Sequence, residues 1–154
     1  MPSVVSEIVE VVIFRFAREG PEFLLIKRSP DDVLYPGLWQ VVTGSVQAAE
    51  TAVRAARREV LEETGLSALE FWVVPYVGSF YDAQHDRVHL TPFFAAEAPP
   101  GAEVRLSSEH EKFRWAELAE ATGMLPWPAQ KEALRVLHDA ILKGGPAASL
   151  SRLR

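Results

Sequence analysis

The chain has 154 residues, of which 48% are hydrophobic and 24% charged, the composition of a single globular domain rather than of a disordered or fibrous chain. It has no cysteine, which excludes disulfides, thiolate zinc sites and cysteine nucleophiles and makes the cytoplasm the expected compartment. The formal net charge of −5 disfavours nonspecific attraction to nucleic acid. No apolar run is long enough to predict a membrane span, so we expect one soluble domain over residues 1–154.

Three β-rich runs open the chain. A turn at Arg18-Glu19-Gly20-Pro21 separates the first two runs, which indicates a strand pair. A loop with two prolines and two aspartates comes before the third run, which leads directly into Gly44. The three runs are residues 4–16, 23–28 and 39–43.

A helix is predicted over residues 51–64. This segment has no proline or glycine and is rich in alanine. Thr51 can cap the start of the helix, and Gly65 can end it in a left-handed conformation.

The second half of the chain predicts a hairpin and then helices. Residues 69–81 and 87–96 are β-rich and flank a short polar turn. A brief strand, a helical turn and a second long helix follow at residues 113–115, 116–122 and 128–142, and the end from Gly144 is expected to be frayed. Because a hairpin stands where a doubly wound fold would need a crossover, we expect an α+β fold with a mixed sheet flanked by helices.

The predicted helix at residues 51–64 carries an acidic face near its end. At 100° per residue, Glu59, Glu62 and Glu63 share an arc of about 100°, so all three carboxylates can face one ion. A solvated surface would explain most glutamate-rich helices. Here the like charges repel one another and meet the negative end of the helix dipole, so stability alone does not favour the arrangement. A hard divalent cation with oxygen ligands removes both penalties, which predicts a metal site.

Arg58 falls beside Glu62 on the same helix and is within reach of Glu50 if the preceding loop folds back. One interpretation is a surface ion pair that contributes little to stability. The other is a supporting group that fixes the direction of a carboxylate.

The segment Gly44 to Leu66 resembles the Nudix box, G-x5-E-x7-R-E-U-x-E-E-x-G-U, at every specified position. The resemblance implies an α/β/α sandwich and a loop-helix-loop that binds divalent metal. By analogy, Glu59, Glu62 and Glu63 would be metal ligands together with the Gly44 carbonyl. Arg58 and Glu50 would form a supporting ion pair. The chain departs from the family at Thr43 and Ala49, where many members have glycine, so the geometry of this loop is in question.

Two further stretches resemble bacterial dihydroneopterin triphosphate and dATP pyrophosphohydrolases of this family. They are Trp39 to Val46, at the approach to the box, and Glu109 to Trp115. In that group Glu109 would add a metal ligand or a base, and Trp39 and Gln40 would contact the base or pterin ring. A buried aromatic is the alternative for Trp39, and a surface charge is the alternative for Glu109.

Arg28 and Tyr81 complete the expected substrate-binding residues. Diadenosine polyphosphate hydrolases use a tyrosine about fifteen residues beyond the box, which is where Tyr81 stands in this chain. Membership of that subfamily is therefore an open alternative. The four histidines are dispersed, and the spacing of His85 and His89 crosses a turn, which argues against a zinc pair. Surface histidines or hydrogen-bonded core histidines are the expectation.

The expected function is hydrolysis of a nucleoside or pterin triphosphate to a monophosphate and pyrophosphate, with Mg²⁺ as the cofactor and Mn²⁺ as a substitute. Glu62 or Glu109 would accept the proton of the attacking water. The alternatives are a dinucleoside polyphosphate hydrolase and a non-catalytic nucleotide sensor. A small-molecule substrate, neither nucleic acid nor membrane as partner, and a monomer or homodimer complete the expectations.

Overall fold

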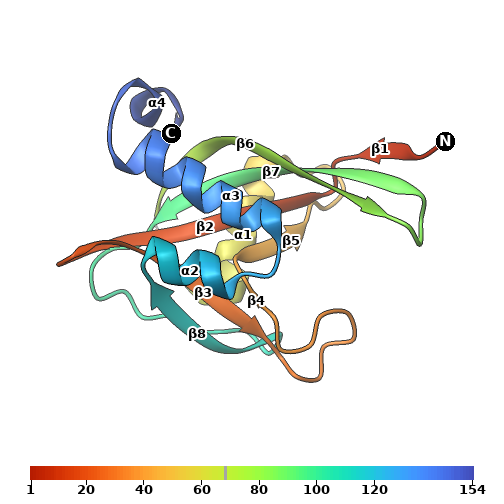
Figure 1. The fold of residues 1–154 in the computed structure, drawn as a ribbon, viewed down its shortest axis with the longest axis horizontal. Helices are drawn as coiled ribbons and strands as arrows, with labels where there is room; N and C mark the ends of the chain where they lie inside the picture. Colours follow the sequence, from red (N-terminus) through yellow and green to blue (C-terminus); the bar gives the residue numbers. More distant parts are fainter. Residues whose placement is uncertain (68) are drawn as a thin grey trace.

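The computed structural model describes residues 1–67 and 69–154 and contains one mixed sheet with helices on both of its faces (Figure 1). The sheet runs in the order β4-β3-β2-β7-β6-β9, with β1 added to β7, β5 to β2 and β8 to β3. Its strands are β1 (Ser3–Val5), β2 (Ile8–Ala17), β3 (Gly20–Arg28), β4 (Trp39–Gln40), β5 (Val42–Ser45), β6 (Glu70–Asp82), β7 (Arg87–Glu97), β8 (His110–Ala116) and β9 (Arg152–Leu153).

The two faces of the sheet bury separate hydrophobic clusters, because side chains alternate along each strand. In β2, Val9, Val11 and Ile13 belong to the first cluster, whereas Val12 and Phe14 belong to the second. The parallel pairing of β2 with β7 and the antiparallel pairing of β2 with β3 make the sheet mixed, as the sequence predicts.

Helix α1 (Ala52–Thr64) covers the first cluster and agrees with the helix predicted over residues 51–64. Ala55, Ala56 and Val60 are buried against the sheet. The opposite face is covered by α2 (Leu118–Met124) and α3 (Pro128–Val136), which continues as a π-helical turn, η1 (Leu137–Leu142). The expected second long helix is therefore present, with its last turn wound more loosely than an α-helix.

The run expected over residues 4–16 is not one strand. Ser6 and Glu7 are exposed and interrupt it, so the chain changes partner at this point. β1 pairs in parallel with β7, while β2 starts at Ile8 and pairs with its own neighbours. The strand expected at residues 113–115 is longer than predicted, since β8 runs beside β3 over most of its length.

The expectation of a frayed end from Gly144 is wrong for the last residues. They form α4 (Pro146–Leu150) and β9, which adds to the edge of β6. The Trp72 indole donates a hydrogen bond to the Ala148 carbonyl at 3.1 Å, and Leu153 packs against the first cluster. Periodicity could not reveal this, because so short a segment is ordered by tertiary contacts.

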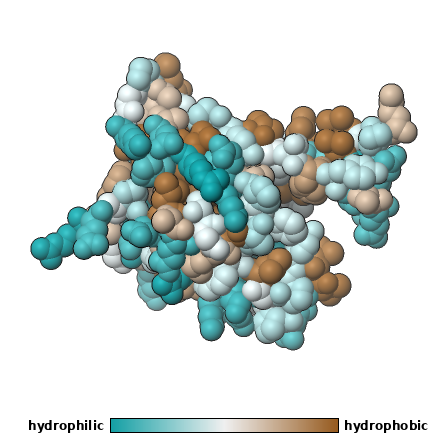
Figure 2. Space-filling view, viewed as in Figure 1, coloured by the Kyte–Doolittle hydropathy of each residue, from teal (hydrophilic) through white to brown (hydrophobic). Residues whose placement is uncertain are grey.

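The face of the molecule shown in Figure 2 mixes polar and apolar residues. None of the helices in residues 1–67 and 69–154 combines the length and the apolar character that a membrane crossing requires.

Candidate active site

The acidic motif lies on α1, whose two ends are fixed as the sequence predicts. The Thr51 hydroxyl accepts a hydrogen bond from the Arg54 backbone N–H at 3.2 Å. Gly65 ends the helix with φ 71°, in the left-handed region. Its N–H donates to the Leu61 carbonyl at 2.9 Å. These caps fix where the last turn of the helix, with its glutamates, meets the sheet.

The three glutamates of the motif do not share one environment. Glu63 is only 3% exposed and points inward. The Glu59 side chain is 12% exposed, whereas that of Glu62 is 56% exposed. Glu59 and Glu63 are thus presented to the interior of the site, and Glu62 lies at its rim.

Gly44 in β5 meets Glu59 at very close range. A Cβ atom added to Gly44 would lie 2.0 Å from the Glu59 Cδ, which no real side chain tolerates. The absence of a side chain therefore lets the Glu59 carboxylate rest against the β5 backbone. This contact explains why the motif begins with glycine at this position.

Arg58 forms the supporting ion pair that was expected. Its guanidinium donates to Glu50 at 2.8 and 3.0 Å and to Glu59 at 2.7 Å. It also reaches Glu62 at 3.2 Å and the Ser45 carbonyl at 2.8 Å. One arginine therefore ties the loop before α1, the end of β5 and two motif glutamates together.

The loop departs from the family at two positions, and the structure accommodates each. Ala49 adopts φ 60°, a left-handed conformation that is costly for alanine and easy for glycine. The Thr43 hydroxyl lies 3.3 Å from the Glu10 carboxyl and 3.1 Å from the Val41 carbonyl, and its one proton is shared between these two acceptors. The loop keeps its path with one strained residue and one polar side chain that has partners.

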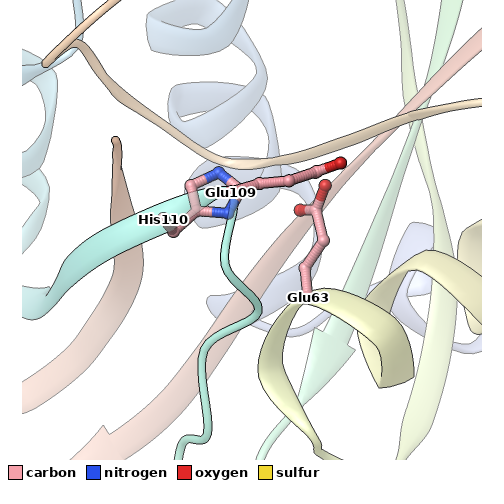
Figure 3. Close-up of side chains that lie close together, drawn as sticks. All are labelled: Glu63, Glu109 and His110. Carbon is pink, nitrogen blue, oxygen red and sulfur yellow. The ribbon is translucent and has the colours of Figure 1, made fainter. Parts of the chain in front are cut away.

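A second acidic element comes from the segment before β8. The carboxylate of Glu109 points toward that of Glu63 on α1, and the His110 ring lies next to them (Figure 3). Each of these three residues offers a ligand atom within 4.8 Å of those of the other two. The structure thus brings together residues that lie far apart in the sequence.

The electrostatics of this group are unfavourable without a counter-ion. Burial, followed by the nearby charges of Glu59 and Glu109, raises the pKa of Glu63 to about 9. Burial is also the main reason why the pKa of Glu59 is raised. Hydrogen bonds from Arg58 act in the opposite direction on Glu50 and lower its pKa to about 2. The buried carboxyls therefore need a cation, whereas Glu50 already has one.

The residues present fit a divalent metal ion. The Oε2 atom of Glu63 is buried without a hydrogen-bond partner, which is costly unless a ligand satisfies it. Glu59 and Glu109 lie close enough for their charges to act on Glu63, and they supply further hard oxygen donors of the type that Mg²⁺ and Mn²⁺ prefer. Glu62 lies at the rim of the site. It would bind the metal ion only if its carboxylate left Arg58 or contacted Arg58 and the ion together.

The residues expected to bind substrate have different surroundings. Arg28 and Gln40 lie beside the acidic group and are hydrogen-bonded to each other at 3.3 Å. Trp39 packs against the second cluster instead, because neighbouring strand residues point to opposite faces. The Tyr81 hydroxyl donates to Asp86 at 2.8 Å within the β6–β7 hairpin, and no contact among the described residues links it to the acidic group. The site therefore draws Arg28 and Gln40 together, but not Trp39 and Tyr81.

A match to the NUDIX domain profile covers residues 7–140, most of the chain. The chain belongs to the NUDIX family. The expectations of a Nudix fold and of a hydrolase that acts on phosphoric anhydride bonds are thus confirmed. As a member of this family, it carries its motif glutamates on α1, the helix that covers the first cluster.

Similar proteins extend this finding. The chain is 36% identical over 125 residues to an octanoyltransferase of Myxococcus xanthus; the match covers 75% of this chain and 32% of that protein, so it spans about a third of that relative. It is 29% identical over 120 residues to the mouse asymmetrical bis(5'-nucleosyl)-tetraphosphatase, covering 77% of this chain and 79% of that one. The structure of Escherichia coli dihydroneopterin triphosphate pyrophosphohydrolase is similar with a TM-score of 0.69 and 23% identity, over 82% of this chain and 92% of that one.

Sequence reasoning missed His110, which it treated as one of four dispersed histidines. His110 is buried, and its Nε2 lies 3.0 Å from the Nε2 of Gln40. Burial, followed by the charge of Arg28, lowers the pKa of His110 to about 4, so the imidazole is neutral at pH 7. The position of His110 directly after Glu109 was the one feature of the sequence that could have placed it at the site. The alternation of β8 and the pairing with β3, which decide its neighbours, are properties of the fold.

Proposed function

We propose that the chain hydrolyses a nucleoside or pterin triphosphate to the monophosphate and pyrophosphate. One observation carries the proposal, namely the buried Glu63 carboxyl, which has an unpartnered oxygen and lies within reach of the charges of Glu59 and Glu109. A divalent cation would stabilise such a group of carboxylates by neutralising their charge. The phosphate oxygens of a triphosphate would complete the coordination of the cation. Arg28 lies beside the group and is suited to a phosphate oxygen, because a guanidinium presents several donors in a plane.

In the proposed reaction a water oxygen attacks phosphorus, and the bond from phosphorus to the leaving pyrophosphate oxygen breaks. A bound Mg²⁺ ion would polarise the phosphate oxygens and stabilise the charge of the transition state. Glu109 or Glu62 accepts the proton of the water, since both are exposed enough to meet it. Arg58 holds Glu59 in place, and Arg28 orients the phosphate chain.

Hydrolysis of a dinucleoside polyphosphate is the second candidate. The specific observation in its favour is the likeness to the mouse tetraphosphatase over 79% of that protein. The two candidates differ in the length of the phosphate chain that the site accepts.

A substrate panel separates them. The protein would be incubated with dATP, dihydroneopterin triphosphate and diadenosine tetraphosphate, with Mg²⁺ and with a chelator, and the products identified by mass. Release of pyrophosphate from a triphosphate supports the proposal. Cleavage of the tetraphosphate alone would favour the second candidate, and no hydrolysis of any member would contradict both.

Glu63→Gln tests the group directly. We expect kcat to fall by roughly a hundredfold or more, because the amide cannot replace a carboxylate ligand. Glu132→Gln makes the same chemical change at an exposed position of α3, where Glu132 pairs with Arg135, and should leave kcat unchanged. Equal rates for the wild type and Glu63→Gln would refute the assignment even if hydrolysis itself were observed.

A further inference from the structure

Three neighbouring strands place Gln40, Arg28 and His110 side by side on the face that carries α1. β3 lies between β4 and β8, with Ile26 paired to Gln40 and Arg28 paired to His110. The register of β3 with β8 shifts between Lys27 and Arg28, at the end of the strand next to the acidic group. Only this meeting of three strands brings the side chains into one row.

The hydrogen bonds of this row have a single consistent direction. Arg28 is a donor only, so its Nη1, at 3.3 Å, must face the oxygen of the Gln40 amide. The nitrogen of that amide then faces His110 Nε2 at 3.0 Å and must donate to it. His110 therefore accepts at Nε2 and carries its proton on Nδ1.

Within this row, Gln40 holds one end of the Arg28 guanidinium, through Nη1. Asp32 holds the other end of the guanidinium, and the Tyr35 ring lies 5.9 Å from the guanidinium carbon. The Nε atom of Arg28 is buried and has no partner in the described part of the chain. The guanidinium is thus fixed in direction while one of its donors remains free.

We propose that Gln40 and His110 are positioning residues that act through Arg28. His110 accepts at Nε2 and thereby fixes the Gln40 amide, and the amide oxygen holds the guanidinium toward the phosphate chain. This inference rests on the proposed function, because it gives Arg28 the role of binding the substrate's phosphate. In this proposal Gln40 supports the phosphate-binding Arg28, whereas the sequence led us to expect that Gln40 contacts the base or pterin ring.

His110 lies close enough to Glu63 and Glu109 to be considered as a metal ligand. Two observations oppose that role. Its Nε2 accepts from Gln40, so the buried and unpartnered Nδ1 carries the proton and has no lone pair for a metal, and Mg²⁺ prefers oxygen to imidazole nitrogen. The positioning role uses the contacts that are present.

The first test is spectroscopic and does not depend on hydrolysis. Nitrogen-15 NMR of the imidazole at pH 7 should show the proton of His110 on Nδ1, and Gln40→Leu should shift the Nε2 resonance. A proton on Nε2 would overturn the proposed direction of the row, whether or not the protein hydrolyses a triphosphate.

The second test is kinetic. His110→Phe should raise KM by roughly five- to tenfold, the effect of losing one buried hydrogen bond, and change kcat by less than threefold. His110→Gln keeps an acceptor near the position of Nε2 and should restore most of the loss. In an Arg28→Ala background, His110→Phe should have no further effect, because the guanidinium through which it acts is gone. An undiminished effect in that background would refute the proposal.

Two additional measurements cover the other outcomes. Mn²⁺ affinity measured without substrate should be the same in the wild type and in His110→Phe, and a tenfold loss would identify His110 as a ligand instead. If His110→Phe does not fold, Gln40→Met interrupts the same row at its middle member and should raise KM at least as much. If no triphosphate is hydrolysed, the proposed function fails separately, and the affinity for inorganic tripolyphosphate takes the place of KM in the same comparisons.

Discussion

At the scale of single residues, Glu10 is a buried acid outside the proposed reaction. It lies in β2 on the face that carries α3, and its Oε1 accepts hydrogen bonds from Gln130 at 2.6 Å and from Thr43 at 3.3 Å. Burial raises its pKa more than these two hydrogen bonds lower it. Both partners are neutral, so no positive charge compensates an ionised carboxyl there.

Glu10 therefore predicts a pH-dependent stability. Its pKa is higher in the folded than in the unfolded state, so its stabilising contribution is present below about pH 4 and is lost as pH rises through the folded value. Glu10→Gln stays neutral and keeps an acceptor for Gln130. At pH 8 we expect the free energy of unfolding of Glu10→Gln to be roughly 1 to 3 kcal/mol higher than that of the wild type. At pH 4 we expect the two free energies of unfolding to be about the same. Urea denaturation at both pH values measures this, with Glu132→Gln as the control; a gain of equal size at pH 4 would contradict the assignment.

Individual side chains also show where sequence reasoning reaches its limit. The roles of Arg58 and Glu50 follow from positions along one helix and its preceding loop, and the structure forms that ion pair. Gln40 and His110, by contrast, lie 70 residues apart in the sequence. Their hydrogen bond depends on which strands become neighbours in the sheet. Spacing along the chain carries no information of that kind until the sheet order is known.

At the scale of elements, α1 was the most predictable part of the molecule. Its start, end and buried stripe follow from local rules, namely a threonine cap, a terminal glycine and a helical repeat. β1 and β9 were less predictable, because each has only two or three residues and forms by adding to the edge of a longer strand. Such strands derive their stability from the partner and leave little trace in composition.

The loop before α1 contains a strained residue that can be tested. Ala49 adopts φ 60°, which costs an alanine roughly 1 to 2 kcal/mol, whereas glycine adopts it freely. We expect Ala49→Gly to raise the free energy of unfolding by about 0.5 to 1 kcal/mol, after the greater flexibility of glycine in the unfolded chain is subtracted. Ala48→Gly, one residue earlier and without a positive φ, should lower it. Thermal denaturation of both variants gives the answer, and destabilisation by Ala49→Gly would show that the left-handed conformation is not populated in solution.

At the scale of the whole molecule, the segment before β8, which carries Glu109, contacts two elements that are distant from it in the chain. The end of α1 contacts the segment before β8 through backbone hydrogen bonds from Arg105 to Thr64 at 2.8 Å and from Ser107 to Glu63 at 3.4 Å. The end of β3 contacts the same segment through Ser29 and Glu109 at 2.9 Å. A cation held by Glu63 and Glu59 on α1 and by Glu109 before β8 would therefore link the helix to the segment that leads into the sheet.

Because the metal would bind the folded chain and not the unfolded one, its addition should stabilise the protein. At a concentration about 100 times its Kd the gain is about 2.7 kcal/mol, or roughly 5 to 10 °C in Tm for a domain of this size. The pKa of Glu63, about 9 without metal, keeps this carboxyl protonated at pH 7, so binding should release a proton and the shift in Tm should grow from pH 6 to pH 8.5. Thermal scans with Mn²⁺ or chelator at both pH values measure the shift, and calorimetry in buffers of different ionisation enthalpy counts the proton. Glu132→Gln should behave like the wild type, whereas Glu63→Gln should lose most of the shift and the proton release; an equal shift in Glu63→Gln would place the metal elsewhere.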